Sequence, residues 1–270
     1  MSPNENDLSF VGHLEVLRWH IIRSVIAVVV LAVVAFVAKD IVFGKVIMGP
    51  SKADFVTYQT LCKLADKLDT QALCFNIDFK KQNRKVTGQF TTHIIVSITV
   101  GFILAFPYIF WEMWRFIKPA LYDNEEKSIK GTVFWVTLLF AMGISFGYFV
   151  VSPLTVNFMI NYTIDPEIEN IIDISSYISV ITGLIIVCGL MFQLPIACYF
   201  LSKAGLLYPQ AMKDHRKHAI IVTLFVSALF TPPEPFSQVC IAVPLLLLYE
   251  ISIKISAAVA RKREKELLAG

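Results

Sequence analysis

The 22 residues Gly131–Ser152, GTVFWVTLLFAMGISFGYFVVS, contain no charged side chain and decide the class of fold. A helix needs about 20 mostly apolar residues to cross about 30 Å of hydrocarbon. This stretch therefore predicts a helix that crosses a lipid bilayer.

Similar apolar blocks lie on both sides of this stretch. Hydrophobic residues make up 56% of the 270-residue chain and charged residues only 17%, which is far from the balance of a soluble domain. The last two blocks are short for a bilayer, and Glu250 and Lys254 beyond the sixth are spaced to pair on a helix. We predict an all-α polytopic membrane protein of six transmembrane helices, whose other five blocks are Ile21–Ala38, Thr92–Trp111, Ile178–Leu201, Ala219–Phe230 and Val239–Tyr249.

Charge and motif content exclude several other classes of protein. The formal net charge of +3 is too small to indicate a nucleic-acid partner. The five cysteines form no CxxC pair and no cluster with histidine, so we expect no metal site, and we expect no other cofactor. No G-x-x-x-x-G-K-[ST] motif is present, so the energy for any transport would come from an ion gradient or a partner ATPase.

Lysine and arginine gather in alternate connections, as expected for cytoplasmic loops. The connection 153–177 has neither residue and is acidic, whereas the connection 39–85 carries nine basic residues and is an exception to the pattern. We predict that both termini are cytoplasmic. The predicted organisation is an amino-terminal segment 1–20, a membrane domain 21–257 and a basic tail 258–270, with external loops at about 39–90, 153–177 and 231–238 and cytoplasmic loops at about 115–130 and 202–218.

The first external loop has a second notable feature. The region from Ser51 to Asp78 has the pattern of a partly helical, amphipathic segment and contains Cys62 and Cys74. Outside the cytoplasm the two thiols could form a disulfide, and they could equally remain free and buried.

The motif Gly143-Ile-Ser145-Phe-Gly147 has two readings. It fits the G-x-S-x-G turn of serine hydrolases, which would suggest an intramembrane protease. It also fits GxxxG, the pattern by which membrane helices pack closely. The hydrolase turn requires a strand followed by a helix, so the uncharged helical context favours packing, and we expect no enzymatic activity.

Ionisable residues within the spans are few and lie near their ends. Near the middle of the fourth span, Gln193 is a polar residue that cannot hold a charge. A carrier driven by protons normally needs carboxylates or histidines at that depth. This scarcity weighs against the alternative function, an ion-coupled transporter of small solutes.

The loop between the second and third spans is the most informative. Pro119 is expected to end the second span at the membrane surface. Asp123 and Glu126 have the spacing of a capping box for the third span. Glu125 is left over, either as an anion favoured in the first helical turn or as a functional carboxylate.

Four segments of this chain together resemble the TatC family, the C subunit of the twin-arginine (Sec-independent) protein translocase. They are His13-Leu-x-x-Leu-Arg18, Phe116-Ile-x-Pro-Ala-Leu-Tyr122 with Glu125, Phe146-Gly-Tyr-Phe-Val-Val-x-Pro153, and Leu229-Phe-Thr-Pro-Pro-x-x-Phe-Ser-Gln238 followed by Pro244 and Glu250.

The resemblance implies a receptor for signal peptides with two adjacent arginines. Such a subunit forms the core of a multimeric complex that exports folded proteins across the cytoplasmic membrane on the proton-motive force. Its partners would be the signal peptides of precursor proteins, single-span TatA- and TatB-like subunits and membrane lipids. The implied signal-peptide residues are Glu125, Phe116, Glu15 and Arg18, and the implied partner-contact residues are Thr231, Gln238 and Glu234.

Two departures from the family pattern bear on this assignment. The family places a second carboxylate two positions before Arg18, where this chain has Val16, and Glu15 is one residue earlier. One residue corresponds to about 100° around a helix, so Glu15 is expected to face another direction. Many members also have a glutamate where this chain has Gln193, so a proton relay at that position is excluded.

Overall fold

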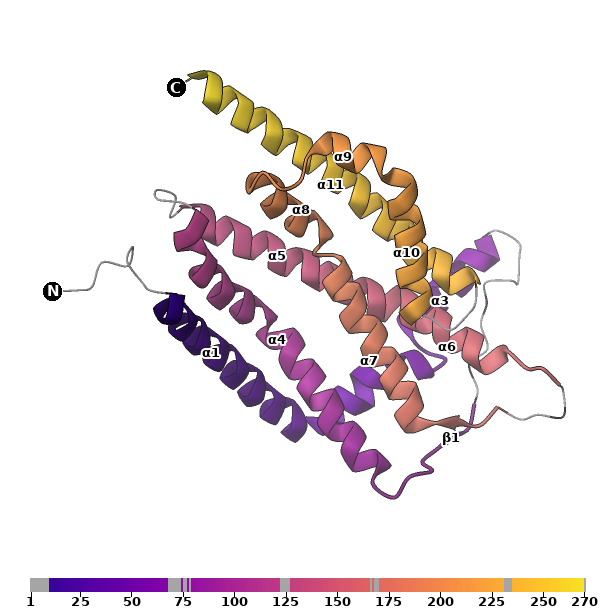
Figure 1. The fold of residues 1–270 in the computed structure, drawn as a ribbon. Helices are drawn as coiled ribbons and strands as arrows, with labels where there is room; N and C mark the ends of the chain where they lie inside the picture. Colours follow the sequence, from indigo (N-terminus) through magenta and orange to yellow (C-terminus); the bar gives the residue numbers. More distant parts are fainter. Residues whose placement is uncertain are drawn as a thin grey trace. The chain divides into compact units, whose positions relative to one another are not determined.

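The computed structural model describes residues 10–67, 74, 77, 79–121, 127–165, 167, 170–230 and 235–269. Helices dominate these residues (Figure 1). Five stretches of helix in the described part are long and apolar enough to cross a membrane, and these are Leu14–Val37, Gly88–Phe116, Gly131–Asn161, Ile174–Lys203 and Gln238–Lys262. The prediction of a polytopic helical membrane protein is confirmed.

The chain divides into two compact units, of which the first comprises residues 1–39 and 93–138. It contains α1 (Phe10–Val37), most of α4 (Gly88–Leu121) and the start of α5 (Lys127–Phe146). Helices α1 and α4 run antiparallel, since His20 contacts Glu112 and Phe36 contacts His93. At Gly101 a side-chain carbon would lie only 2.6 Å from the backbone nitrogen of Ala32, so glycine is required for this close approach.

The second unit comprises residues 40–92 and 139–270. Strands β1 (Lys81–Gln82) and β2 (Ile172–Asp173) pair in parallel, with Lys81 opposite Ile172. The other elements, besides the start of α4 and the end of α5, are α2 (Lys39–Ile41), η2 (Val42–Ile47), η3 (Gly49–Ser51), α3 (Val56–Lys67), η4 (Gly147–Val151), α6 (Ser152–Asn161), α7 (Ile174–Met191), α8 (Leu194–Lys203), α9 (Pro209–Asp214), α10 (Arg216–Phe230) and α11 (Pro235–Ala269).

Asp173 caps the amino-terminal end of α7. Its carboxylate accepts hydrogen bonds from the backbone N–H groups of Arg84, Ser175 and Ser176. These bonds, that of Arg84 foremost, hold the pKa of Asp173 below its usual range. The cap satisfies amide groups that the first helical turn leaves without partners.

The core of the second unit forms where η4, α7 and α11 meet, around Val151, Leu184, Cys188, Ile241, Leu245 and Leu248. Small residues allow α5 and η4 to approach α7 closely. A side-chain carbon at Gly143 would lie 2.6 Å from the Cys188 carbonyl oxygen, and one at Gly147 would lie 3.0 Å from the Ile185 Cα. The packing reading of the GxxxG motif is therefore confirmed, and Ser145 lies in a helix rather than in a hydrolase turn.

Three tyrosines bind the short segment formed by η2 and η3. The hydroxyl groups of Tyr148 and Tyr177 donate to the carbonyl oxygens of Val46 and Ile47. The Tyr58 hydroxyl on α3 lies 2.8 Å from the Pro50 carbonyl oxygen and 3.1 Å from that of Pro153, and its burial raises its pKa. We call η2, η3 and α3 the cap.

A disulfide joins Cys62 at α3 to Cys74. Of the two states left open by the sequence, the structure thus shows the bridged one. The amphipathic helix expected between Ser51 and Asp78 is α3.

Several expected boundaries are wrong. Helix α4 continues past Pro119 to Leu121, the last described residue before the loop. The sixth span is part of α11, a 35-residue helix, so it is not short. Glu250 does not end it, because its carboxylate pairs with Arg216 of α10 at 2.8 Å instead of with Lys254. The fifth block is short as expected, since α10 has 15 residues.

Candidate functional site

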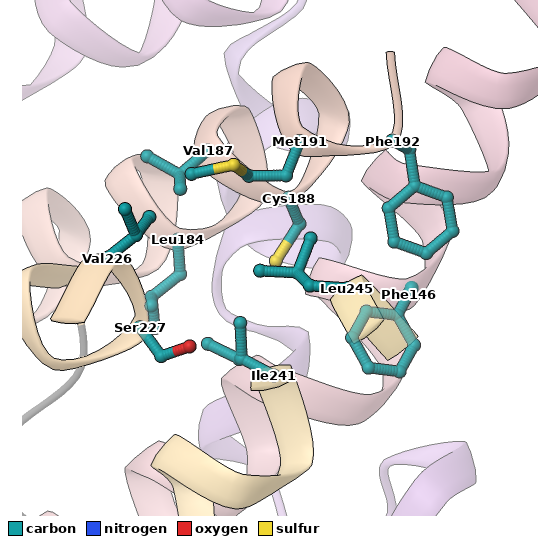
Figure 2. Close-up of a pocket in the computed structure, with 10 residues that line it drawn as sticks. All are labelled: Phe146, Leu184, Val187, Cys188, Met191, Phe192, Val226, Ser227, Ile241 and Leu245. Atoms are coloured by element: carbon teal, nitrogen blue, oxygen red, sulfur yellow. The ribbon is translucent and has the colours of Figure 1, made fainter. Parts of the chain in front are cut away.

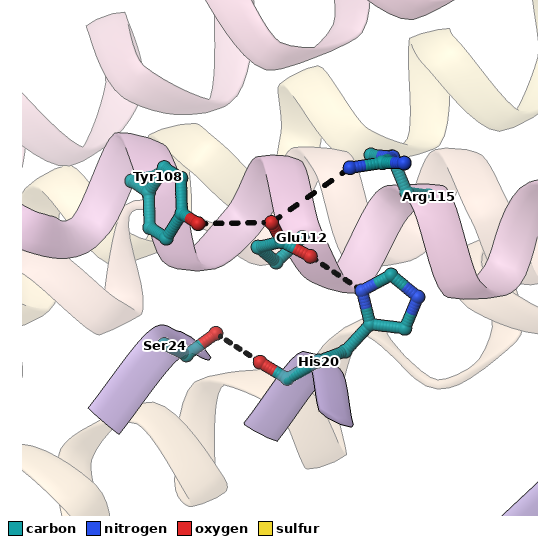
Figure 3. Close-up of polar contacts among 5 residues, drawn as sticks. All are labelled: His20, Ser24, Tyr108, Glu112 and Arg115. Carbon is teal, nitrogen blue, oxygen red and sulfur yellow. Dashed lines mark hydrogen bonds and ion pairs between the residues drawn. The ribbon is translucent and has the colours of Figure 1, made fainter. Parts of the chain in front are cut away.

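A group of polar side chains lies between α1 and α4 in the first unit (Figure 3). The Glu112 carboxylate accepts a hydrogen bond from His20 Nδ1 through one oxygen. Its other oxygen accepts one from the Tyr108 hydroxyl at 3.0 Å and lies 3.9 Å from an Arg115 guanidinium nitrogen.

Glu112 is 1% exposed, so its charge is removed from solvent. Burying a carboxylate is costly unless it is paired and its oxygens are hydrogen-bonded. Here both oxygens have partners, which explains how a buried acid persists on an apolar helix. Removing one partner of such a pair typically costs about 3–5 kcal/mol.

Aromatic side chains surround this group. Phe116 follows Glu112 by one helical turn, and its ring centre lies 6.1 Å from that of His20. The guanidinium of Arg115 lies over the Trp111 ring at 4.9 Å from its centre. A guanidinium group can pair with a carboxylate and stack on an aromatic ring, so this arrangement suits arginine side chains.

Of the four signal-peptide residues expected from the sequence, the structure describes the surroundings of three. Phe116 is half-buried beside His20, whereas Glu15 and Arg18 are exposed on α1. At 100° per residue, Val16 lies only about 40° from His20 around the helix, while Glu15 lies about 140° away. Glu15 therefore does not occupy the row of α1 that faces α4, as its one-residue offset predicted.

Glu125, Thr231 and Glu234, together with the proposed capping pair Asp123 and Glu126, lie outside the described residues. Gln238 is described, and its side-chain amide donates to the Leu224 carbonyl oxygen of α10 at 3.0 Å.

Gln193 lies at an interruption of the fourth span, between the end of α7 and the start of α8. Its backbone carbonyl oxygen accepts hydrogen bonds from Ile196 and Ala197. Pro195 lies in the first turn of α8, where a proline is well tolerated. The same proline would disrupt a helix that ran without a break from α7 into α8. The polar amide thus belongs to a break in the helix.

The sequence prediction missed the pairing of His20 with Glu112. Both residues were visible as polar groups near the ends of apolar blocks. However, they are 92 positions apart, and only the packing of α1 on α4 brings them together. One signal was available, since a carboxylate within a membrane span generally requires a partner.

A pocket in the second unit has a different character (Figure 2). Its lining is apolar except for the hydroxyl of Ser227, which donates to the Thr223 carbonyl oxygen. The lining residues are Phe146, Leu184, Val187, Cys188, Met191, Phe192, Val226, Ser227, Ile241 and Leu245. Such a surface suits aliphatic groups rather than a polar solute.

Comparison with known proteins gives consistent matches. Residues 12–244 match the family model described as "Sec-independent protein translocase protein (TatC)". The chain is 38% identical over 266 residues to the Sec-independent protein translocase protein TatC of a Blattabacterium species, covering 97% of this chain and all of that protein. It is 32% identical over 243 residues to the TatC protein of Campylobacter jejuni, covering 90% of this chain and 91% of that protein.

Solved structures agree with the sequence matches. A crystal structure described as the twin arginine translocase receptor TatC in DDM aligns with a TM-score of 0.71 at 31% identity, covering 90% of this chain and 99% of that one. A second crystal structure of the receptor aligns with a TM-score of 0.68 at 30% identity, covering 92% and 99%.

Proposed function

We infer the function from one premise, which is that this chain belongs to the TatC family of Sec-independent protein translocase proteins. It is a multi-pass protein of the cytoplasmic membrane and the receptor and core subunit of a twin-arginine translocase. The observation that carries this conclusion is the match over residues 12–244 together with the shared fold. The solute-carrier alternative is set aside, because the relatives reported above are translocase proteins and the pocket is apolar.

We propose that the signal peptide binds at the amino-terminal end of α1 and the carboxy-terminal end of α4. Phe116 would contribute an aromatic surface, and Glu125 in the following loop would receive an arginine. Glu15 and Arg18 are exposed on α1, which leaves them available to a peptide that lies across both helix ends.

The first prediction concerns the signal peptide itself. Changing its two arginines to lysines should weaken crosslinking to residues 116–126 of this chain. A guanidinium binds one carboxylate through two parallel hydrogen bonds, whereas a lysine ammonium offers only a point charge. We would measure the crosslinked fraction over a peptide titration, with a peptide changed elsewhere as the control. Equal crosslinking of the arginine and lysine peptides would show that two parallel hydrogen bonds to a carboxylate are not needed for binding.

We also propose that single-span partner subunits bind along α10 and the start of α11, near Thr231, Glu234 and Gln238. Two features support this. Helix α10 is only about 22 Å long at 1.5 Å per residue, which is less than the hydrocarbon thickness. The pocket lined mainly by α7, α10 and α11 is apolar and has room for about one water-sized group, so a neighbouring helix would cover it rather than insert side chains into it.

A photo-crosslinking residue at position 238 should therefore capture a short single-span protein in native membranes. The matched control is position 251, which is exposed on the same helix and lies about 20 Å further along it. We expect a strong product from position 238 and a weak one from position 251. Equal products from both would show that the contact is unspecific.

A further inference from the structure

The contact of α1 with α4 in the first unit is small. Among the described side chains of α1, only His20, Ser24, Ala32 and Ala35 are buried. The apolar residues that face outward suit lipid and place no constraint on how α1 is rotated. A few contacts must therefore fix its orientation.

One end of this contact is fixed independently. Gly101 admits the backbone of Ala32, and the His93 ring stacks on Phe36 with its centre 3.9 Å away. His93 Nε2 also lies 3.1 Å from the Phe36 carbonyl oxygen. These contacts hold the carboxy-terminal end of α1.

The other end of the contact is about 18 Å away, counting twelve residues from Ala32 to His20. There the His20 imidazole and the Glu112 carboxylate join the two helices (Figure 3). The Phe116 ring lies beside His20. The Ser24 hydroxyl donates to the His20 carbonyl oxygen within α1, so it does not link the helices.

We propose that the buried His20–Glu112 pair positions the amino-terminal end of α1 relative to the carboxy-terminal end of α4, the two parts of the proposed signal-peptide surface. The proposal rests on the function inferred above. The hydrogen bond between the imidazole and the carboxylate is directional, so it aligns this end of α1 on α4 more narrowly than an apolar contact would. The alignment matters because Glu15 and Arg18 on α1 and Phe116 on α4 must keep a fixed separation to contact one peptide together. His20 and Glu112 are thus positioning residues and not the groups that bind the peptide.

The experiment separates this positioning role from a role in stability alone. The apolar double variant His20→Phe/Glu112→Leu removes both polar side chains together, so neither is left buried without the other. The swapped variant His20→Glu/Glu112→His restores the pair in the opposite sense. Ser24→Ala is the matched control, since it removes a hydrogen bond within α1 one turn away.

Each variant would be purified as the full chain, and two quantities would be measured. The first is the thermal unfolding temperature, and the second is the apparent Kd for a twin-arginine signal peptide by crosslinking titration. We expect the apolar double variant to unfold near the wild-type temperature yet bind about tenfold more weakly, as when one charge-assisted contact is misaligned. The swapped variant and Ser24→Ala should bind within about threefold of wild type.

Wild-type affinity in a folded apolar double variant would overturn the proposal. If that variant does not accumulate, the swapped variant decides alone. Binding close to wild type then supports the positioning role, and a folded swapped variant with binding about tenfold weaker overturns it. Failure of the wild-type chain to bind the peptide would instead contradict the proposed function.

Discussion

Replacing Glu125 with Gln is expected to lower export of a folded reporter with a twin-arginine signal by about ten- to hundredfold. The substitution keeps the size of the side chain but removes the charge that would hold a guanidinium. A charge-assisted hydrogen bond contributes about 1.5–3 kcal/mol, and each 1.4 kcal/mol corresponds to a factor of ten. The neighbouring Asp123 and Glu126 have the spacing of a capping box, so they are expected to be engaged at the start of the third span and not to replace Glu125.

Export would be followed by the appearance of the reporter outside the cytoplasm, normalised to the amount of this chain in the membrane. Glu126→Gln is the control, because glutamine still serves in a capping box. The control should export the reporter at the wild-type rate. Normal export by Glu125→Gln would contradict the role proposed for that carboxylate.

Substitution of Gly143 by Leu should prevent the second unit from folding, so that little protein accumulates. Even the first side-chain carbon would lie 2.6 Å from the Cys188 carbonyl oxygen and 2.8 Å from the Gly189 Cα. These are backbone atoms, which cannot move aside without separating α5 from α7. Overpacking a core typically costs about 1–3 kcal/mol, and a clash with backbone belongs at or above the upper end.

The comparison for this prediction is Gly183→Ala on α7, where a side-chain carbon would meet no atom within 4 Å. Alanine favours helix over glycine by about 0.5–1 kcal/mol, so this variant should be at least as stable as wild type. Membrane yield and thermal unfolding in detergent would be measured for both variants. Similar behaviour of the two would show that the close approach at Gly143 is not required.

Some features of the fold follow from sequence and others do not. Uncharged blocks such as Gly131–Ser152 predict spans reliably, because burying charge in hydrocarbon is costly. Their ends are predicted less well, since these depend on contacts elsewhere. Glu250 was expected to lie beyond the sixth span and to be able to pair with Lys254, but it pairs with Arg216 of α10 and α11 continues past it.

The candidate site shows the same division. The motif around Phe116 predicts where the signal peptide binds and remains a prediction, whereas the offset of Glu15 from Val16 was visible from helical geometry. The pairing of His20 with Glu112 was not predictable, because no local pattern states which helices are neighbours. Contacts between residues that are far apart in sequence require the packing itself.

The Cys62–Cys74 disulfide at the edge of the cap has a consequence for the order in which the protein matures. With the loop outside, as the charges of the other connections predict, its cysteines meet oxidants only after they have crossed the bilayer. Insertion of the flanking helices α1 and α4 must then precede closure of the Cys62–Cys74 bond. During biogenesis the newly made chain therefore passes through a thiol form, and the disulfide closes only after the loop has crossed the bilayer.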